Sequence, residues 1–169
     1  VFRVPGYEPT MERLRRHSST TAHLSALVAR HAALDPETAF VCGLLHDVGI
    51  AAALTDVAET SKGAPAPVEG LVPVLDAVHA QASGLLAGVW KLAGEVKDAV
   101  AHHHQLAAGG KPDRMVSVLM VAEQLAYEHD GGMAPVRWAE DGAAEPLPPP
   151  PGSLDSNPAA VLQETRELL

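Results

Sequence analysis

The stretch Gly43-Leu44-Leu45-His46-Asp47-Val48-Gly49 is the most informative part of this chain. It lies inside an apolar run from Ala39 to Ala53, in which one His and one Asp are the only strongly polar residues. Burial of a carboxylate costs several kcal/mol unless the group is paired or bound to a metal ion. The rest of the sequence must therefore supply a partner for Asp47.

Composition limits the classes of protein to which the chain can belong. The 169 residues suffice for one domain, and the net charge of −9 argues against general nucleic-acid binding, which needs a basic surface. No uninterrupted apolar run reaches the about 18–20 residues of a membrane span, so no membrane partner is expected. Cys42 is the only cysteine, and Val1–Pro5 lack the pattern of a signal peptide. We therefore expect a reducing, cytoplasmic location.

Helical periodicity dominates the chain, and no segment of four to eight residues alternates between apolar and polar as a half-buried strand does. We expect an all-α, single-domain bundle of about six or seven helices, with residues 1–130 as its body. Residues 131–169 are predicted to be a Pro-rich loop (131–152) and a C-terminal helix that packs on the same domain. The other expected helices are 11–34, 35 to about 49, 71–87, about 94–104 and 113–129, with residues 55–70 as a loop.

Polar residues recur on the inward faces of these helices. At 100° per residue, His17 lies within about 20° of the apolar stripe formed by Leu24 and Val28. His103 is likewise in register with apolar residues of its own helix. The full set of inward-facing polar residues is His17, His46, Asp47, His79, His103, His104 and Glu123, with His102 as a neighbour.

Imidazoles and carboxylates that project from different helices towards one point are typical of a metal site in a helical core. Asp47 has two oxygens and can bridge two ions. We expect one or two divalent ions, with Fe, Mn, Zn and Ni all compatible with this set of ligands. Each residue alone has an ordinary structural explanation: a hydrogen-bonded core histidine for His17, a buried pair for His46 and Asp47, a helix end for His102–His104, and a surface position for Glu123.

At this point the residues resemble a known family, the HD superfamily, and within it the HDOD branch of bacterial signalling domains. Four segments between about Arg16 and Ala126 carry the resemblance. They are Arg16-His17-Ser18, the run Asp35–Gly49, His79-Ala80-Gln81 followed by Trp90-Lys91-Leu92, and His103-His104.

The resemblance implies an all-α bundle in which His17, His46, Asp47, His79, His103 and His104 bind divalent ions. The family's final Asp ligand falls at Glu123, which is one methylene longer. The acidic residue and the Tyr that mark the HD-GYP phosphodiesterases after the His-His pair are missing from 105–112. Cleavage of cyclic dinucleotides in the manner of that group is therefore not implied.

Three functions are compatible with such a centre. The first is a metal-dependent phosphohydrolase or phosphodiesterase acting on a phosphorylated small molecule or a nucleotide, in which Asp47 bridges the ions and Arg16, Lys111 or Arg114 neutralises phosphate charge. The second is a non-catalytic signalling module with a protein partner. The third is a di-iron oxygenase of the HD type. The sequence clearly favours a metal-binding protein. Among its possible functions, hydrolysis is favoured only slightly over a regulatory role.

Overall fold

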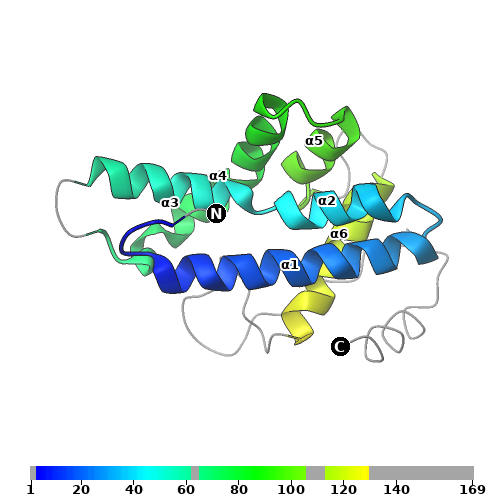
Figure 1. The fold of residues 1–169 in the computed structure, drawn as a ribbon, viewed down its shortest axis with the longest axis horizontal. Helices are drawn as coiled ribbons and strands as arrows, with labels where there is room; N and C mark the ends of the chain where they lie inside the picture. Colours follow the sequence, from blue (N-terminus) through cyan, green and yellow to red (C-terminus); the bar gives the residue numbers. More distant parts are fainter. Residues whose placement is uncertain (1–2, 62–64, 106–112, 130–169) are drawn as a thin grey trace.

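The first half of the chain doubles back on itself, so that two long helical stretches lie side by side (Figure 1). Helix α1 spans Glu8–His31, and the chain returns along it through α2 (Pro36–Leu45) and α3 (Val48–Thr60). The computed structural model describes residues 3–61, 65–105 and 113–129. Lys111 and the segment 131–169, with its expected Pro-rich loop and C-terminal helix, lie outside these residues.

The second half adds α4 (Val68–Val89), α5 (Gly94–Ala101) and α6 (Arg114–His129). Helix α4 packs against α3 and α5, while α6 crosses α1 and also contacts α2 and α5 (Figure 1). The described residues contain these six helices and no strand, which confirms the all-α prediction.

Side-chain caps define where two of these helices begin. The carboxylate of Asp35 accepts a hydrogen bond from the backbone N–H of Thr38 at 2.8 Å, and Pro36 occupies the first helical position of α2. Asp113 accepts hydrogen bonds from the N–H groups of Met115 (2.8 Å) and Val116 (3.2 Å) before α6. The two caps set the starts of two helices that carry or lead into polar core residues.

The predicted boundaries are wrong in the middle of the chain. The loop expected at 55–70 is shorter, because α3 continues to Thr60 and α4 already begins at Val68. Val57 and Val68 pack against a small apolar cluster that contains Leu54, and this burial extends both helices beyond what local composition indicates. Helix α5 ends at Ala101, so His103 and His104 lie in a turn after it.

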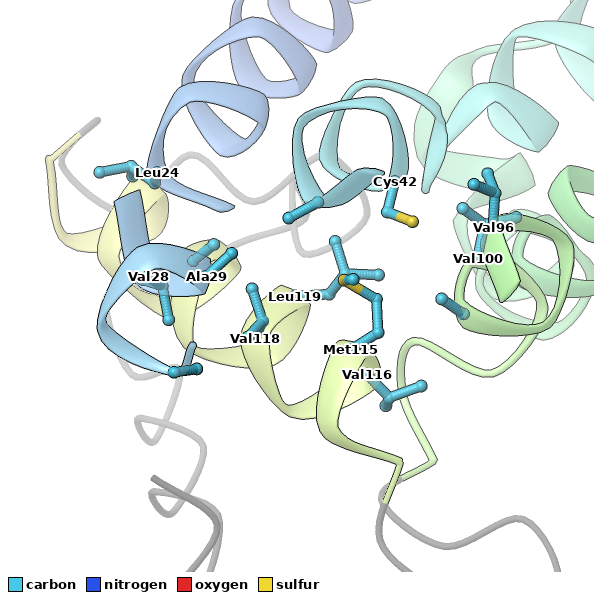
Figure 2. Packing of buried hydrophobic residues seen from close by; sticks show 14 of the residues in the cluster. Leu24, Val28, Ala29, Cys42, Val96, Val100, Met115, Val116, Val118 and Leu119 are labelled. Carbon is cyan, nitrogen blue, oxygen red and sulfur yellow. The ribbon is translucent and has the colours of Figure 1, made fainter. Parts of the chain in front are cut away.

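The larger apolar core lies where α1, α2, α5 and α6 meet (Figure 2). Aliphatic side chains and one thiol fill it, as the low aromatic content of 4% requires. Its labelled members in Figure 2 are Leu24, Val28, Ala29, Cys42, Val96, Val100, Met115, Val116, Val118 and Leu119.

The buried thiol of Cys42 gives a test of this packing. Burial raises the pKa of the Cys42 thiol to about 12, so the reactive thiolate is scarce at neutral pH. We expect the native protein to react with a thiol reagent at least about 100-fold more slowly than the urea-unfolded chain at pH 8. The reaction is followed by the absorbance of the group that a chromogenic reagent releases on reacting with the thiol. Equal reaction rates for the native and the unfolded protein would contradict the placement of Cys42 in the core.

Two helical stretches, Pro36–Thr60 and Val68–Val89, have the length and the apolar composition of membrane spans. The first is half buried and contains the strongly polar pair His46 and Asp47, and the second contains the buried His79. Core helices of soluble proteins have the same composition, so this feature says little about location.

Candidate metal centre

Four histidine side chains converge on the carboxylate of Asp47. Its Oδ2 atom lies 3.2 Å from Nε2 of His46 and 3.9 Å from Nε2 of His17. Its Oδ1 atom lies 3.5 Å from Nε2 of His79 and 3.5 Å from Nε2 of His103. All five side chains are buried. Each carboxylate oxygen therefore faces its own pair of imidazoles.

The pair His46–Asp47 lies at a break between two helices, and not within one continuous helix as the sequence suggested. His46 ends α2 with helical backbone angles, whereas Asp47 precedes α3 with φ −104° and ψ 10°. Because the backbone turns at this point, the Asp47 carboxylate makes no capping hydrogen bond and lies instead among the imidazoles.

Backbone carbonyl groups hold three of the histidine rings in one orientation. Nδ1 of His46 donates to Gly43 O (2.8 Å), and Nδ1 of His103 donates to Val100 O (2.7 Å). Nδ1 of His79 lies 2.9 Å from Leu75 O. A carbonyl oxygen only accepts, so each ring carries a proton on Nδ1 and directs its Nε2 atom at Asp47, where that atom offers a lone pair once the ring is neutral. This is the tautomer and the support that metal-ligating histidines have in proteins.

The potential ligands form two groups on either side of Asp47. In each group, one ligand atom from every member lies within 4.8 Å of the others. One group consists of His17, His46 and Glu123, and the other of His79, His103 and His104. With one oxygen of Asp47 added to each, the two groups offer four ligands apiece, which suits two adjacent cations with a shared carboxylate.

Polar atoms without hydrogen bonds show that these residues fit a cation. Nε2 of His17, Nε2 of His103 and Oδ1 of Asp47 are buried in the described structure and have no hydrogen-bond partner. Buried polar atoms without a partner are costly and uncommon in folded proteins. Divalent cations between the two groups would give each of these atoms a partner.

The charges of the cluster depend on one another. Burial lowers the pKa of the His17 imidazole to about 4, with a further contribution from His46. Burial also opposes a charge on His46, but the Asp47 carboxylate outweighs it and raises the pKa of His46 to about 9. The pKa of Asp47 lies well below its ordinary value, because the His46 and His103 imidazoles outweigh the effect of burial. Any cation bound at His46 therefore has to displace a proton.

The second group is the more open of the two. His104 is 40% exposed, and its Nε2 lies 2.9 Å from Nε2 of His79. Desolvation of the ring and the neighbouring His103 and His79 lower the pKa of His104 to about 3, so it is neutral at pH 7. Glu123 faces His104 with 3.9 Å between Oε2 and Nδ1, and burial raises its pKa. This edge is where the cluster meets solvent.

Close backbone packing holds the helices that carry the ligands, which was not predicted from the sequence. A Cβ atom at Gly43 would lie 2.8 Å from the Thr21 carbonyl oxygen of α1, so α1 and α2 touch through their backbones. The N–H of Gly49 donates to the buried hydroxyl of Ser83 at 2.9 Å, which ties α3 to α4. Ser83 is four residues after His79, but nothing in its sequence context indicates this role.

The basic side chains that were predicted to bind phosphate do not all lie near the histidine cluster. Arg16 follows Arg15 on the outer face of α1, where its side chain is exposed and lies 3.9 Å from Glu12. Arg114 donates to the carbonyl of Ala32. Ala32 is 15 residues after His17, or about 22 Å along the helix axis. Arg114 thus helps to attach α6 to the end of α1, and Lys111 lies outside the described residues.

A cavity of about 850 Å³ lies between the first half of α1 and the junction of α2 and α3. Ser18, Leu45 and Val48, which are sequence neighbours of His17, His46 and Asp47, contribute to its lining. None of the seven predicted ligands lines it, and its other walls are mostly apolar. The cavity therefore lies beside the histidine cluster without including any of its ligands.

Comparison of the chain with family profiles matches the HDOD domain over residues 1–106. This chain belongs to the HDOD family. The matched residues include α1 to α5 and thus every histidine of the cluster, while Glu123 in α6 lies beyond them. No curated protein and no solved structure matches the chain. The HDOD domain described here is thus a helical domain of the HD superfamily whose buried His, Asp and Glu groups can hold metal ions.

Proposed function

We propose that this HDOD domain is a divalent-metal-dependent phosphohydrolase with a dinuclear centre, acting on a phosphoester of a small molecule or nucleotide. One observation carries the proposal: two groups of three ligand atoms lie on either side of Asp47, whose two oxygens face one group each. Pairs of divalent ions with a shared carboxylate are the usual arrangement in hydrolases of phosphate esters.

The protein's own groups would prepare this reaction in three ways. The carbonyls of Gly43, Leu75 and Val100 keep the Nε2 atoms of three histidines directed at the centre. The Asp47 carboxylate supplies negative charge where both cations would sit. The exposed side of His104 leaves an opening to solvent for a phosphate group. Two bound cations would neutralise phosphate oxygens and lower the pKa of a water molecule.

The test is hydrolysis of bis(4-nitrophenyl) phosphate by protein loaded with Mn²⁺, Fe²⁺ or Zn²⁺. We expect turnover that a chelator abolishes, and a loss in kcat/KM of more than about 100-fold for His79→Ala, beyond the effect typical of outer-shell partners. His102→Ala is the matched control, since its Nδ1 donates to Asp98 O and the side chain is outside both groups. Turnover that survives both chelation and His79→Ala would overturn the proposal.

Membership of the HDOD family favours a second function, that of a non-catalytic signalling module that holds metal for structure. Fully metal-loaded protein without turnover on phosphomonoesters or phosphodiesters would establish this function in place of hydrolysis. Oxygen uptake with the iron-loaded form, absent with Mn²⁺ or Zn²⁺, would instead indicate the di-iron oxygenase.

A further inference from the structure

Helix α4 presents an apolar stripe to solvent on the side opposite His79. Val74, Val78, Leu85 and Val89 are 61%, 40%, 71% and 74% exposed, and they account for four of the six large apolar side chains exposed in the described structure. At 100° per residue the stripe occupies an arc of about 120° and contains no charged residue. Its remaining exposed members are Gly70, Ala77, Gln81 and Gly88.

Concentration of exposed apolar side chains on one helix face marks an interaction surface. We propose that a second copy of this chain covers the stripe, with the two α4 helices antiparallel across a two-fold axis. A two-fold interface is formed by the same patch on both copies, so the patch must be complementary to itself.

The spacing of the stripe meets this requirement. The midpoint between Val74 and Val89 lies between residues 81 and 82, and so does the midpoint between Val78 and Leu85. An axis through that point therefore sets Val74 opposite Val89 of the partner subunit and Val78 opposite Leu85 of the partner subunit. Apolar groups therefore meet apolar groups at these four positions of each copy.

The polar residue of the stripe also fits this arrangement. Gln81 lies beside the axis, so the two Gln81 side chains come within about 2 Å of each other along the helix direction. An amide carries both donors and an acceptor, and two such groups can pair with each other. Antiparallel helices also set opposite ends of their dipoles side by side, which favours this direction over a parallel pair.

The available area indicates the strength of the contact. The free energy gained on burial of a Val or Leu side chain is proportional to its apolar surface. By this proportionality, a fully exposed side chain of this kind offers roughly 60–120 Å² of apolar surface. The four exposed aliphatic residues thus supply about 150–300 Å² per subunit, and stable complexes bury about 800 Å² per partner. With its small residues added, the stripe matches the smaller, transient class of interface. The dimer should therefore be reversible and depend on concentration.

Disulfide trapping in the full chain tests the register. Gln81→Cys should give covalent dimers under mild oxidation, and so should the double variant Val74→Cys/Val89→Cys. Val74→Cys alone should not, because the two copies of residue 74 would be about 22 Å apart and a disulfide needs Cα atoms within about 7 Å. Cys42 is buried and leaves the background low. Trapping by Val74→Cys alone, or none by the double variant, would overturn the antiparallel arrangement.

Sedimentation equilibrium tests the association itself. The average mass of the wild-type chain should rise from 17.6 kDa towards twice that value between about 10 µM and 1 mM. Leu85→Asp should remain at the monomer mass, whereas Leu44→Asp, a matched change at a 41% exposed leucine of α2, should behave as the wild type does. A wild-type chain that stays monomeric throughout, or a Leu85→Asp variant that associates normally, would overturn the proposal.

Discussion

Replacement of Asp47 by Asn is expected to remove both metal ions, reducing the bound metal from about two ions per chain to less than about 0.5. The substitution conserves the volume of the side chain but removes its negative charge and one of its two acceptor oxygens. Both oxygens face imidazoles, at 3.2 and 3.9 Å on one side and at 3.5 Å on the other. Among the described residues, Glu123 is the other carboxylate of the cluster; it belongs to the group of His17 and His46, and its Oε2 lies 3.9 Å from Nδ1 of His104.

Elemental analysis after purification without chelator measures this effect, with circular dichroism to verify the fold. His102→Ala is the control, because it removes an imidazole of the same segment that belongs to neither group. Retention of both ions by Asp47→Asn would show that the carboxylate does not join the two positions.

The substitution Gly49→Ala is expected to lower the free energy of unfolding by about 3 kcal/mol or more, because it adds a methyl group to a core that has no room for it. Its Cβ would lie 2.2 Å from the carbonyl oxygen of His79 and 2.9 Å from the backbone nitrogen of Ser83. Both obstacles are backbone atoms of α4, so they can give way only if the helix moves. Movement of α4 would also displace His79, so metal affinity should fall together with stability.

The matched control is Gly70→Ala in the first turn of α4, where a Cβ would meet nothing within 4 Å. In a helix this substitution should be neutral or stabilise by up to about 1 kcal/mol. Urea denaturation of the metal-free proteins gives both values. A Gly49→Ala variant as stable as Gly70→Ala would contradict the close packing of α3 on α4.

The sequence predicted the inward faces of the helices well and their ends poorly. His17 could be placed because it shares a helix face with Leu24 and Val28 at helical spacing. His103 is also buried, as predicted, but it lies in the turn after α5 and not on a helix. The break at Asp47 could not be foreseen, because the run Leu45–Ile50 contains no proline and its only glycine serves for packing against α4. The break instead accompanies tertiary contacts, because the Asp47 carboxylate lies among imidazoles supplied by α1, α4 and the turn after α5.

The candidate site was predicted as a set of residues but not as a geometry. The seven predicted ligands lie close together: six of them form two groups of three, and Asp47 faces two histidines of each group. Arg114 was proposed from its nearness in sequence to the histidines, and its guanidinium donates to the carbonyl of Ala32 at the end of α1. A role for Arg16, Lys111 or Arg114 in binding phosphate stays a prediction.

Anomalous diffraction from crystals grown with Mn²⁺ or Zn²⁺ tests the central claim most directly. Two peaks are expected about 3.5–4 Å apart, one on each side of the Asp47 carboxylate. One peak should lie among His17, His46 and Glu123, and the other among His79, His103 and His104. Peaks confined to surface residues, or none at all, would contradict the assignment of this cluster as a dinuclear metal centre.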